Sequence, residues 1–395
     1  MNRRRALQLL AAAVGTTGLT AACGTDVGDG TPEQGSPIKI GLIAPQAGGY
    51  KPIGDEIVNG FQLFLDLNDQ RLGERPVTLL TVDEGETATS GKAAVDGLLQ
   101  QGVLALTGVV NSSVMVGIRD TVEQARVPLV GSNASPATLQ SVVYIWRTSY
   151  VLDEPGRALG RYLKQRLPAN DRIVIVAPEN VGSLDVIKGF TQEFGESDPR
   201  LAGEPVWTRF ATDPDNTFFA AGIQQALGRN PDAVFCFYAG PAAVQFIKQL
   251  RGAGYRGPIY GPGFLTEGSV LSEIKPAEAA NIMTSLNYSA DLNNAANRRF
   301  AAAYRKKHSA SPTTYAMASY DAAQVLDKAV RLAGPGANSQ QVNLALGKVG
   351  QIDSPRGPWQ FNQPRTPQQK WYLRKVQLDG QVLANAMVSE LATLG

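Results

Sequence analysis

Hydroxyl side chains follow two short apolar segments in the first third of the chain. Ser112 and Ser113 come soon after residues 103–107, and Ser135 comes soon after residues 127–130. If these segments are neighbouring parallel strands, their carboxyl ends meet at one edge of a sheet, and we expect Ser112 and Ser135 to face one cleft. Hydroxyls and the backbone N–H groups of a helix N-terminus suit a carboxylate. The alternative is that these serines only cap helices.

Other site chemistry has little support in the sequence. The 395 residues include one histidine, His308, and two cysteines, which disfavours a His-rich metal site, a Ser-His-Asp triad and a disulfide framework. Residues 252–257 match a dinucleotide-binding pattern but follow a predicted helix and precede a strand, the reverse of the required order. We therefore expect no enzyme, no cofactor and no metal.

The composition is that of an ordinary folded protein with no nucleic-acid signature. Apolar residues make up 43 % and charged residues 18 % of the chain. The 37 Lys and Arg nearly balance the 35 Asp and Glu, giving a formal net charge of +2 and no basic footprint for nucleic acid. The length suggests two or three domains.

The N-terminus has the layout of an export signal. Three arginines at 3–5 precede an Ala/Leu-rich segment at 6–19, and small residues lead to Cys23. This pattern predicts a signal peptide over 1–22, lipidation of Cys23, and a flexible tether over 23–36. Cleavage near residue 22 with an incidental cysteine is the alternative, and both general and twin-arginine export stay open. We expect an exported, extracytoplasmic protein, anchored to the membrane by its lipid in the periplasm or at the cell surface.

The body alternates predicted strands and helices, which is typical of parallel α/β sheets. The pattern restarts near residue 172 and predicts two α/β lobes of similar build. Cys236, within an apolar strand, is expected to be a buried core residue. Predicted strands cover 38–43, 77–82, 103–107, 127–130, 172–177, 232–238, 258–260 and 371–378, and predicted helices cover 54–69, 90–101, 113–125, 184–194, 218–227, 242–252, 294–308, 316–332 and 340–349.

Segments in a fixed order over more than three hundred residues carry a resemblance to a known family. They are residues 40–45, 54–60, 108–113, 127–130, 135–136, 146–148, 171–176, 231–235, 315–322 and 357–361. With them the chain resembles type I periplasmic binding proteins of the leucine/isoleucine/valine-binding family, the substrate receptors of branched-chain amino-acid ABC transporters. The resemblance implies two Rossmann-like lobes joined by a three-crossover hinge, with the ligand cleft between them. Lobe 1 would comprise 37–147 and 289–363, and lobe 2 would comprise 148–288 and 364–395.

The resemblance also implies ligand-binding positions. Two departures from the family pattern bear on the site. Val181 stands where the family often has an aromatic residue, and Gly263 stands where an acidic residue commonly pairs with a ligand ammonium; Asp185 or Glu267 would have to substitute for that acid. The implied ligand is a small polar solute, either an amino acid or another small carboxylate or amide, delivered to an ABC permease by a monomeric receptor. A sensor of the same fold that signals to a partner protein is the alternative. The implied ligand-binding residues are Ser112, Ser113, Asn133, Ser135, Tyr150, Val181, Tyr238 and Gly263.

Overall fold

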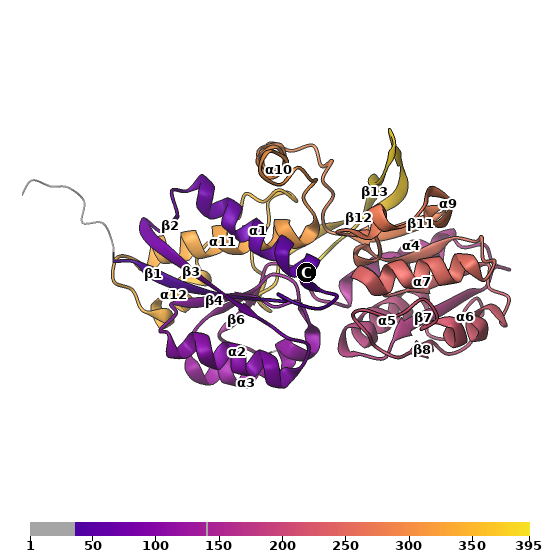
Figure 1. Cartoon of the computed structure of the whole chain (residues 1–395), viewed down its shortest axis with the longest axis horizontal. Helices are drawn as coiled ribbons and strands as arrows, with labels where there is room; N and C mark the ends of the chain where they lie inside the picture. Colours follow the sequence, from indigo (N-terminus) through magenta and orange to yellow (C-terminus); the bar gives the residue numbers. More distant parts are fainter. Residues whose placement is uncertain (1–35, 140) are drawn as a thin grey trace, which may run out of the picture. The chain divides into compact units, whose positions relative to one another are not determined.

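The computed structural model describes residues 36–139 and 141–395, which form two β-sheets flanked by helices (Figure 1). The expected signal peptide, Cys23 and the expected tether up to residue 35 lie outside the described residues. Within the described part of the chain, no helix combines the length and apolar character needed to cross a membrane.

The first sheet has six strands in the order β2-β3-β1-β4-β5-β6. All neighbours are parallel except the short β2, which pairs with β3 in antiparallel fashion. This order places the carboxyl ends of β1, β4 and β5 side by side. The strands are β1 (Ile38–Ala44), β2 (Arg71–Leu72), β3 (Arg75–Asp83), β4 (Ala105–Gly108), β5 (Leu129–Gly131) and β6 (Ile145–Arg147), and the accompanying helices are α1 (Lys51–Leu67), α2 (Ala88–Gln100), α3 (Ser112–Ala125), α10 (Ala295–His308), α11 (Thr314–Ala333) and α12 (Ser339–Leu346).

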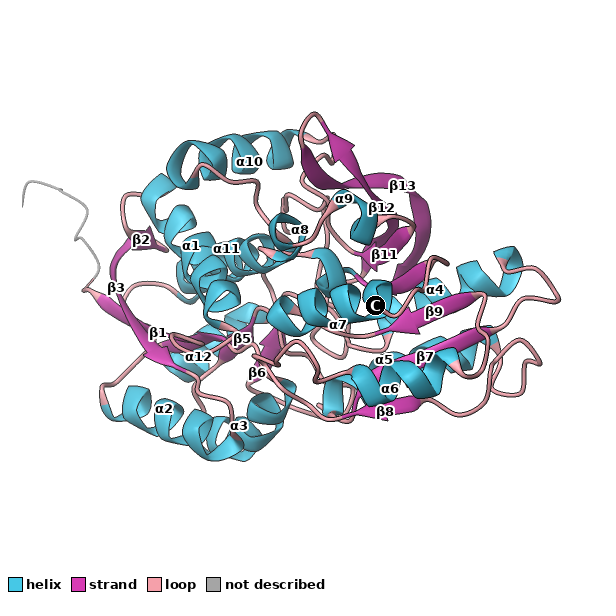
Figure 2. Ribbon diagram, turned by 45° about the vertical axis from the view of Figure 1, so that its right-hand side comes forward, coloured by secondary structure: helices cyan, strands magenta, loops and turns pink. Residues whose placement is uncertain are grey.

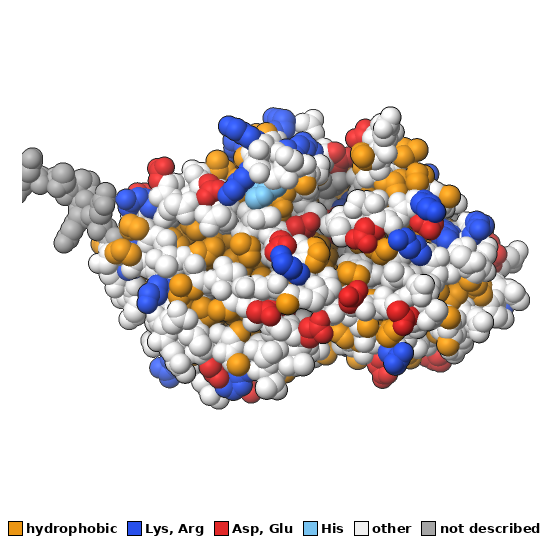
Figure 3. All heavy atoms as spheres, in the orientation of Figure 1, with side chains coloured by type: hydrophobic (Ala, Val, Ile, Leu, Met, Phe, Trp, Pro, Cys, Tyr) orange, Lys and Arg blue, Asp and Glu red, His pale blue; other side chains and the backbone are white. Residues whose placement is uncertain are grey.

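The faces of the first sheet are covered by different helices because successive strand residues point to opposite sides. Ile40 and Leu42 of β1 pack with α1, α11 and α12, whereas Ile43 packs with α2 and α3. Charged side chains of both signs are interspersed over the surface drawn in Figure 3, with a basic cluster at α10, whose last turn carries Arg305, Lys306, Lys307 and His308.

The second sheet has seven strands in the order β13-β12-β11-β10-β9-β7-β8 (Figure 2). Strands β7 to β11 are parallel to one another, and a long hairpin of β12 and β13 completes the edge, with β12 antiparallel to both β11 and β13. Helices α4 and α5 pack on one face, and α6 and α7 pack on the other. The elements are β7 (Ile173–Pro178), β8 (Val206–Thr208), β9 (Ala233–Cys236), β10 (Ile259–Pro262), β11 (Ile282–Leu286), β12 (Gln369–Asp379), β13 (Val382–Leu394), α4 (Glu154–Arg166), α5 (Val181–Phe194), α6 (Ala220–Leu227), α7 (Gly240–Gly252), the 3-10 turn η1 (Gly263–Thr266), α8 (Val270–Glu273) and α9 (Pro276–Ala279).

The predicted fold class, two Rossmann-like lobes, is confirmed by these two sheets. Cys236 is a free, fully buried cysteine in β9, as predicted. The expected final strand is in fact the first strand of a hairpin, because β13 follows it after a tight turn. Strand β13 is half-exposed along most of its length and therefore lacks the apolar alternation that marks a strand. The lobe boundaries implied by the resemblance stay a prediction.

A buried ion pair ties together the three segments that connect the sheets. The Arg356 guanidinium lies 3.0 Å from the Asp321 carboxylate, and both side chains are at most 1 % exposed. Arg356 also donates to the carbonyl oxygens of Thr148 and Ser149 in the first connection and to the Gln369 side chain at the end of the third. Asn287, at the start of the second connection, donates to the same Gln369 oxygen. One guanidinium is therefore linked, directly or through Gln369, to every crossing of the chain.

We predict that Arg356→Met lowers the free energy of unfolding by about 3–5 kcal/mol, because it leaves the Asp321 carboxylate buried without its cation. Denaturant unfolding followed by circular dichroism measures this change. Arg299→Met is the matched control, since the Arg299–Asp353 pair has side chains that are 69 % and 68 % exposed and is expected to add no resolvable stability. An Arg356→Met protein that unfolds at the wild-type denaturant concentration would contradict the central role of this pair.

Candidate ligand-binding site

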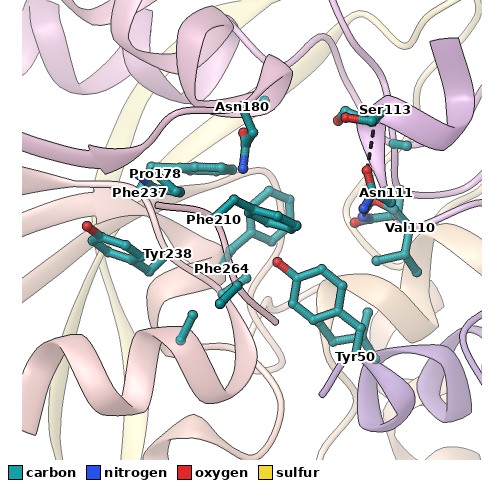
Figure 4. A pocket seen from close by; sticks show the side chains of 18 of the residues that line it. Tyr50, Val110, Asn111, Ser113, Pro178, Asn180, Phe210, Phe237, Tyr238 and Phe264 are labelled. Carbon is teal, nitrogen blue, oxygen red and sulfur yellow. Dashed lines mark hydrogen bonds between the residues drawn. The ribbon is translucent and has the colours of Figure 1, made fainter. Parts of the chain in front are cut away.

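A pocket lies where loops at the carboxyl ends of the strands of both sheets approach each other (Figure 4). It encloses about 800 Å³, including the part open to solvent. The first lobe contributes Tyr50 from the start of α1, the loop between β4 and α3, and the loop after β5. The second lobe contributes the loops that follow β7, β8, β9 and β10.

The N-termini of three helices reach the pocket. Asn111 caps α3 through a 2.8 Å hydrogen bond from the Ser113 N–H to its Oδ1 atom. Asn180 caps α5 in the same way, with its Oδ1 accepting from the Ser183 N–H at 2.9 Å. Gly240, the first residue of α7, has φ +54°, which favours glycine at that turn. Because helix N-termini carry partial positive charge, this arrangement favours a negatively charged group in the pocket.

Aromatic side chains form most of the apolar wall. Phe264 of η1 stacks on Tyr315 of α11, with ring centroids 5.7 Å apart and planes within 8° of parallel. Tyr50 of the first lobe meets Phe210 of the second edge to face at 6.4 Å. In Figure 4 the rings of Tyr50, Phe210, Phe237 and Phe264 point toward one space. The aromatic lining residues are Tyr50, Phe210, Phe219, Phe237, Tyr238, Phe264 and Tyr315.

The charged lining is a single cation. Among the described residues that line the pocket, Arg209 is the only charged one, and its guanidinium lies 4.7 Å above the centre of the Phe218 ring. Neither of the two acidic residues considered from the sequence lines the pocket. Asp185 accepts the Ala137 N–H at 2.8 Å, and Glu267 pairs with Arg374 at 2.6 Å. Within the described residues the pocket therefore presents no carboxylate to a ligand ammonium.

The structure brings together four of the eight ligand-binding positions that the resemblance implies. Ser112, Ser113, Asn133 and Tyr238 line the pocket. Their role in ligand binding stays a prediction, since no ligand is present. Asn133 also donates from its side chain to the Val110 carbonyl at 3.0 Å, which joins the two first-lobe loops.

The other four positions lie behind or beside the lining. Ser135 is fully buried, and its hydroxyl has no hydrogen-bond partner within residues 36–139 and 141–395. Tyr150 lies behind Phe264, with ring centroids 5.9 Å apart. Val181 begins α5 beside the lining residues Asn180 and Gly182. Gly263 is at a crowded point, because a Cβ atom there would lie 2.7 Å from the Arg374 side chain.

Sequence reasoning missed several lining residues. Tyr50 follows a Gly-rich turn, and residues 209–211 belong to an irregular segment after the short strand β8, which the sequence did not predict. Their aromatic and basic character was the available signal. This character alone did not predict a binding role, because exposed aromatic and arginine residues are common in loops. The missed lining residues include Tyr50, Arg209, Phe210, Phe219, Phe237 and Tyr315.

The two lobes touch at the rim of the pocket. The Thr212 hydroxyl donates to the Glu86 carboxylate at 2.6 Å, so the loop after β8 is bonded to the segment after β3. Gly49 lies under the same loop, where a Cβ atom would be only 2.2 Å from the Thr212 carbonyl oxygen. Glycine at position 49 therefore allows an approach of the lobes that any other residue would obstruct.

Comparison with known proteins identifies a family whose solved members share this two-lobed fold. Residues 37–381 match the family described as periplasmic binding protein. The chain belongs to this family. Members that are similar to it over most of their length are receptors for small solutes, and the family places the protein outside the cytoplasm.

Three relatives illustrate the likeness. The chain is 22 % identical to the Leu/Ile/Val-binding protein homolog 6 of Brucella melitensis, over 86 % of this chain and 87 % of that protein. A solute-binding protein of an ABC transporter from R. palustris, solved in complex with benzoate, is 28 % identical with a TM-score of 0.81, over 90 % of this chain and 97 % of that one. The leucine-binding protein LivK of Thermotoga maritima shares the fold, with a TM-score of 0.80 at 21 % identity, over 90 % and 98 % of the two chains.

Proposed function

We propose that the protein is an extracytoplasmic receptor that captures a small aromatic carboxylate and delivers it to an ABC permease. One observation carries the proposal: the pocket combines an aromatic wall and three helix N-termini with one cation, Arg209, and no acidic lining residue among those described. A flat apolar ring suits the wall, and a carboxylate suits the helix N-termini and the hydroxyl groups of Ser112 and Ser113.

An amino-acid ligand fits this pocket less well. Its ammonium would leave water when the lobes close, and burial of an unpaired charge costs several kcal/mol. Asp185 and Glu267, the nearest candidates from the sequence, are held by the Ala137 N–H and by Arg374. The usual position of the acid is taken by Gly263, and the Arg374 side chain fills the space that a larger residue there would need.

The benzoate complex of the R. palustris relative supports the same ligand class. At 28 % identity over 90 % of the chain, that protein is a better guide to ligand chemistry than relatives that share the fold at lower identity. Delivery to a permease is supported by family membership, since its solute-binding members serve ABC transporters.

We predict that benzoate stabilises the protein in a thermal-shift titration, whereas leucine does not. At 100 times its dissociation constant, benzoate is expected to add about 2.7 kcal/mol to the free energy of unfolding. Benzamide is expected to bind more weakly because it lacks the negative charge. Leucine binding more tightly than benzoate would overturn the proposed ligand class, and no shift with any of these compounds would overturn solute capture.

Within this prediction, Ser112→Ala separates a binding role from a helix-capping role. Ser112 is the first residue of α3 and follows the cap Asn111, and Ser339 is the first residue of α12 and follows the cap Asn338. The matched control Ser339→Ala is therefore expected to change stability equally and to leave benzoate binding unchanged. Calorimetric titration of both variants with benzoate measures the difference. Equal affinities would show that Ser112 only starts its helix.

We predict that Gly49→Ala weakens benzoate binding at least tenfold, because the added methyl group collides with the Thr212 carbonyl and keeps the lobes apart. Gly97→Ala is the control, since no atom lies within 4 Å of the Cβ position there. Calorimetric titration with benzoate measures both affinities. Wild-type affinity in Gly49→Ala would show that benzoate binds without the approach of the lobes at this rim.

The N-terminal cysteine is proposed to hold the receptor at the membrane. The support is the sequence pattern of residues 1–23, a basic start, an apolar segment and small residues before Cys23. We predict that Cys23→Ser moves the protein from the membrane fraction to the soluble fraction of cells. Fractionation followed by immunoblotting measures this, with Cys236→Ser as the control. If the Cys23→Ser protein still associates with the membrane, a lipid on Cys23 is not what anchors it.

A further inference from the structure

The loop that carries the first-lobe site residues has an unusual backbone. Val109 adopts φ +69° and Gly108 adopts φ +101°, immediately before Val110 and Asn111 of the pocket wall. A positive φ is rare for a β-branched residue, and such a conformation persists only when its surroundings fix it. Something in the first lobe must therefore hold residues 108–113 in place.

Glu84, which follows β3, supplies the side-chain contact. It is fully buried, and its carboxylate accepts two successive backbone N–H groups, from Val110 to Oε2 and from Asn111 to Oε1, each at 2.6 Å. The turn is also held by the Val109 N–H, which donates to the Ile43 carbonyl at 2.8 Å, and by the Asn133 side chain, which donates to the Val110 carbonyl at 3.0 Å. Glu84 itself is not among the residues that line the pocket.

We propose that Glu84 is a positioning residue, which fixes the loop 108–113 through the Val110 and Asn111 N–H groups so that the start of α3 faces the solute. The carboxylate holds the loop from behind and leaves Ser112 and Ser113 exposed to the pocket. The inference rests on the proposed function, because it takes the solute to be a carboxylate bound by this loop.

The surroundings of Glu84 add a measurable consequence. Burial raises the pKa of Glu84 to about 8, although the two N–H groups act to lower it, and Asp83 raises it further. The other titratable groups near this point are Glu86 and Tyr50, and the described residues place no Lys or Arg within ion-pair distance of Glu84. A second carboxylate at the start of α3 disfavours the ionised form of Glu84. Benzoate binding near pH 8 is therefore expected to take up a proton, and affinity is expected to fall as the pH rises through that value.

The test compares Glu84→Gln with Glu123→Gln. Glu123 is a matched control because its carboxylate also accepts two successive N–H groups, from Val143 and Tyr144, in the same lobe but outside the pocket lining. A glutamine at position 84 can accept only one of the two N–H groups, since its amide end is a donor. Below pH 8, where Glu84 is largely neutral, we expect Glu84→Gln to weaken benzoate binding about tenfold, the effect of losing one buried hydrogen bond to the loop, and to flatten the pH dependence of affinity near pH 8. Glu123→Gln is expected to leave both at wild-type values.

Amide hydrogen exchange provides a readout that needs no ligand. In Glu84→Gln the amides of Val110 and Asn111 are expected to exchange faster than in the wild type, and in Glu123→Gln they are expected to be unchanged. Unchanged exchange and unchanged benzoate affinity in Glu84→Gln would overturn the proposal. If the wild type fails to bind benzoate, the proposed ligand class fails, and the exchange comparison still decides the role of Glu84.

If Glu84→Gln does not fold, the coupling between the solute and Glu84 can be tested on the wild-type protein. Calorimetric titration of the wild type with benzoate at pH 8, in two buffers of different ionisation enthalpy, measures the protons taken up on binding. Proton uptake supports the coupling between the solute and Glu84, and the absence of uptake overturns it.

Discussion

The ion pair of Arg356 and Asp321 is the constraint on which the arrangement of the two sheets depends. A receptor of this kind must join two sheets by several chain crossings without letting them separate. The guanidinium of Arg356 pairs with Asp321 and bonds directly to Ser149 in the first crossing and to Gln369 at the end of the third. Gln369 links it in turn to Asn287 at the start of the second crossing. Burial disfavours both charges, since it raises the pKa of Asp321 and lowers that of Arg356. The pair is retained because each charge is the partner that compensates the other.

The chemistry of the pocket follows from the topology of the sheets. In parallel α/β sheets each strand leads into a helix, so the carboxyl edge of the sheet collects helix N-termini. Two such edges face each other here, so the partial positive charges at the N-termini of α3, α5 and α7 point into the pocket. These charges can attract an anion without a Lys or Arg side chain at the centre of the pocket. The loops after the strands then supply the side chains that line the pocket. In this protein those loops carry aromatic rings and Arg209.

Much of the fold was predictable from the sequence, and the site was predictable in part. The alternation of strands and amphipathic helices identified β1, β4, β5, β7, β9 and β10 because they are buried and mostly apolar, and β3 because it contains a short apolar run. Strand β13 was missed because most of its residues are half-exposed, and β6 because it has only three residues. Ser112 was predictable from its place after a strand, whereas Asn133 was implied by the family resemblance. Phe210 and Arg209 were not, since only the packing of the second lobe brings that irregular loop to the pocket. The burial of Tyr150 behind the lining likewise depends on Phe264, which no local pattern positions.

The burial of Cys236 has a practical consequence for solution work. Its thiol is fully enclosed in β9, and burial raises its pKa, so the reactive thiolate is scarce at neutral pH. In a protein with Cys23 replaced, a single cysteine introduced at the pocket rim would then be the only position that a maleimide dye reaches. An environment-sensitive fluorophore attached there would convert this receptor into an optical reporter of its own solute.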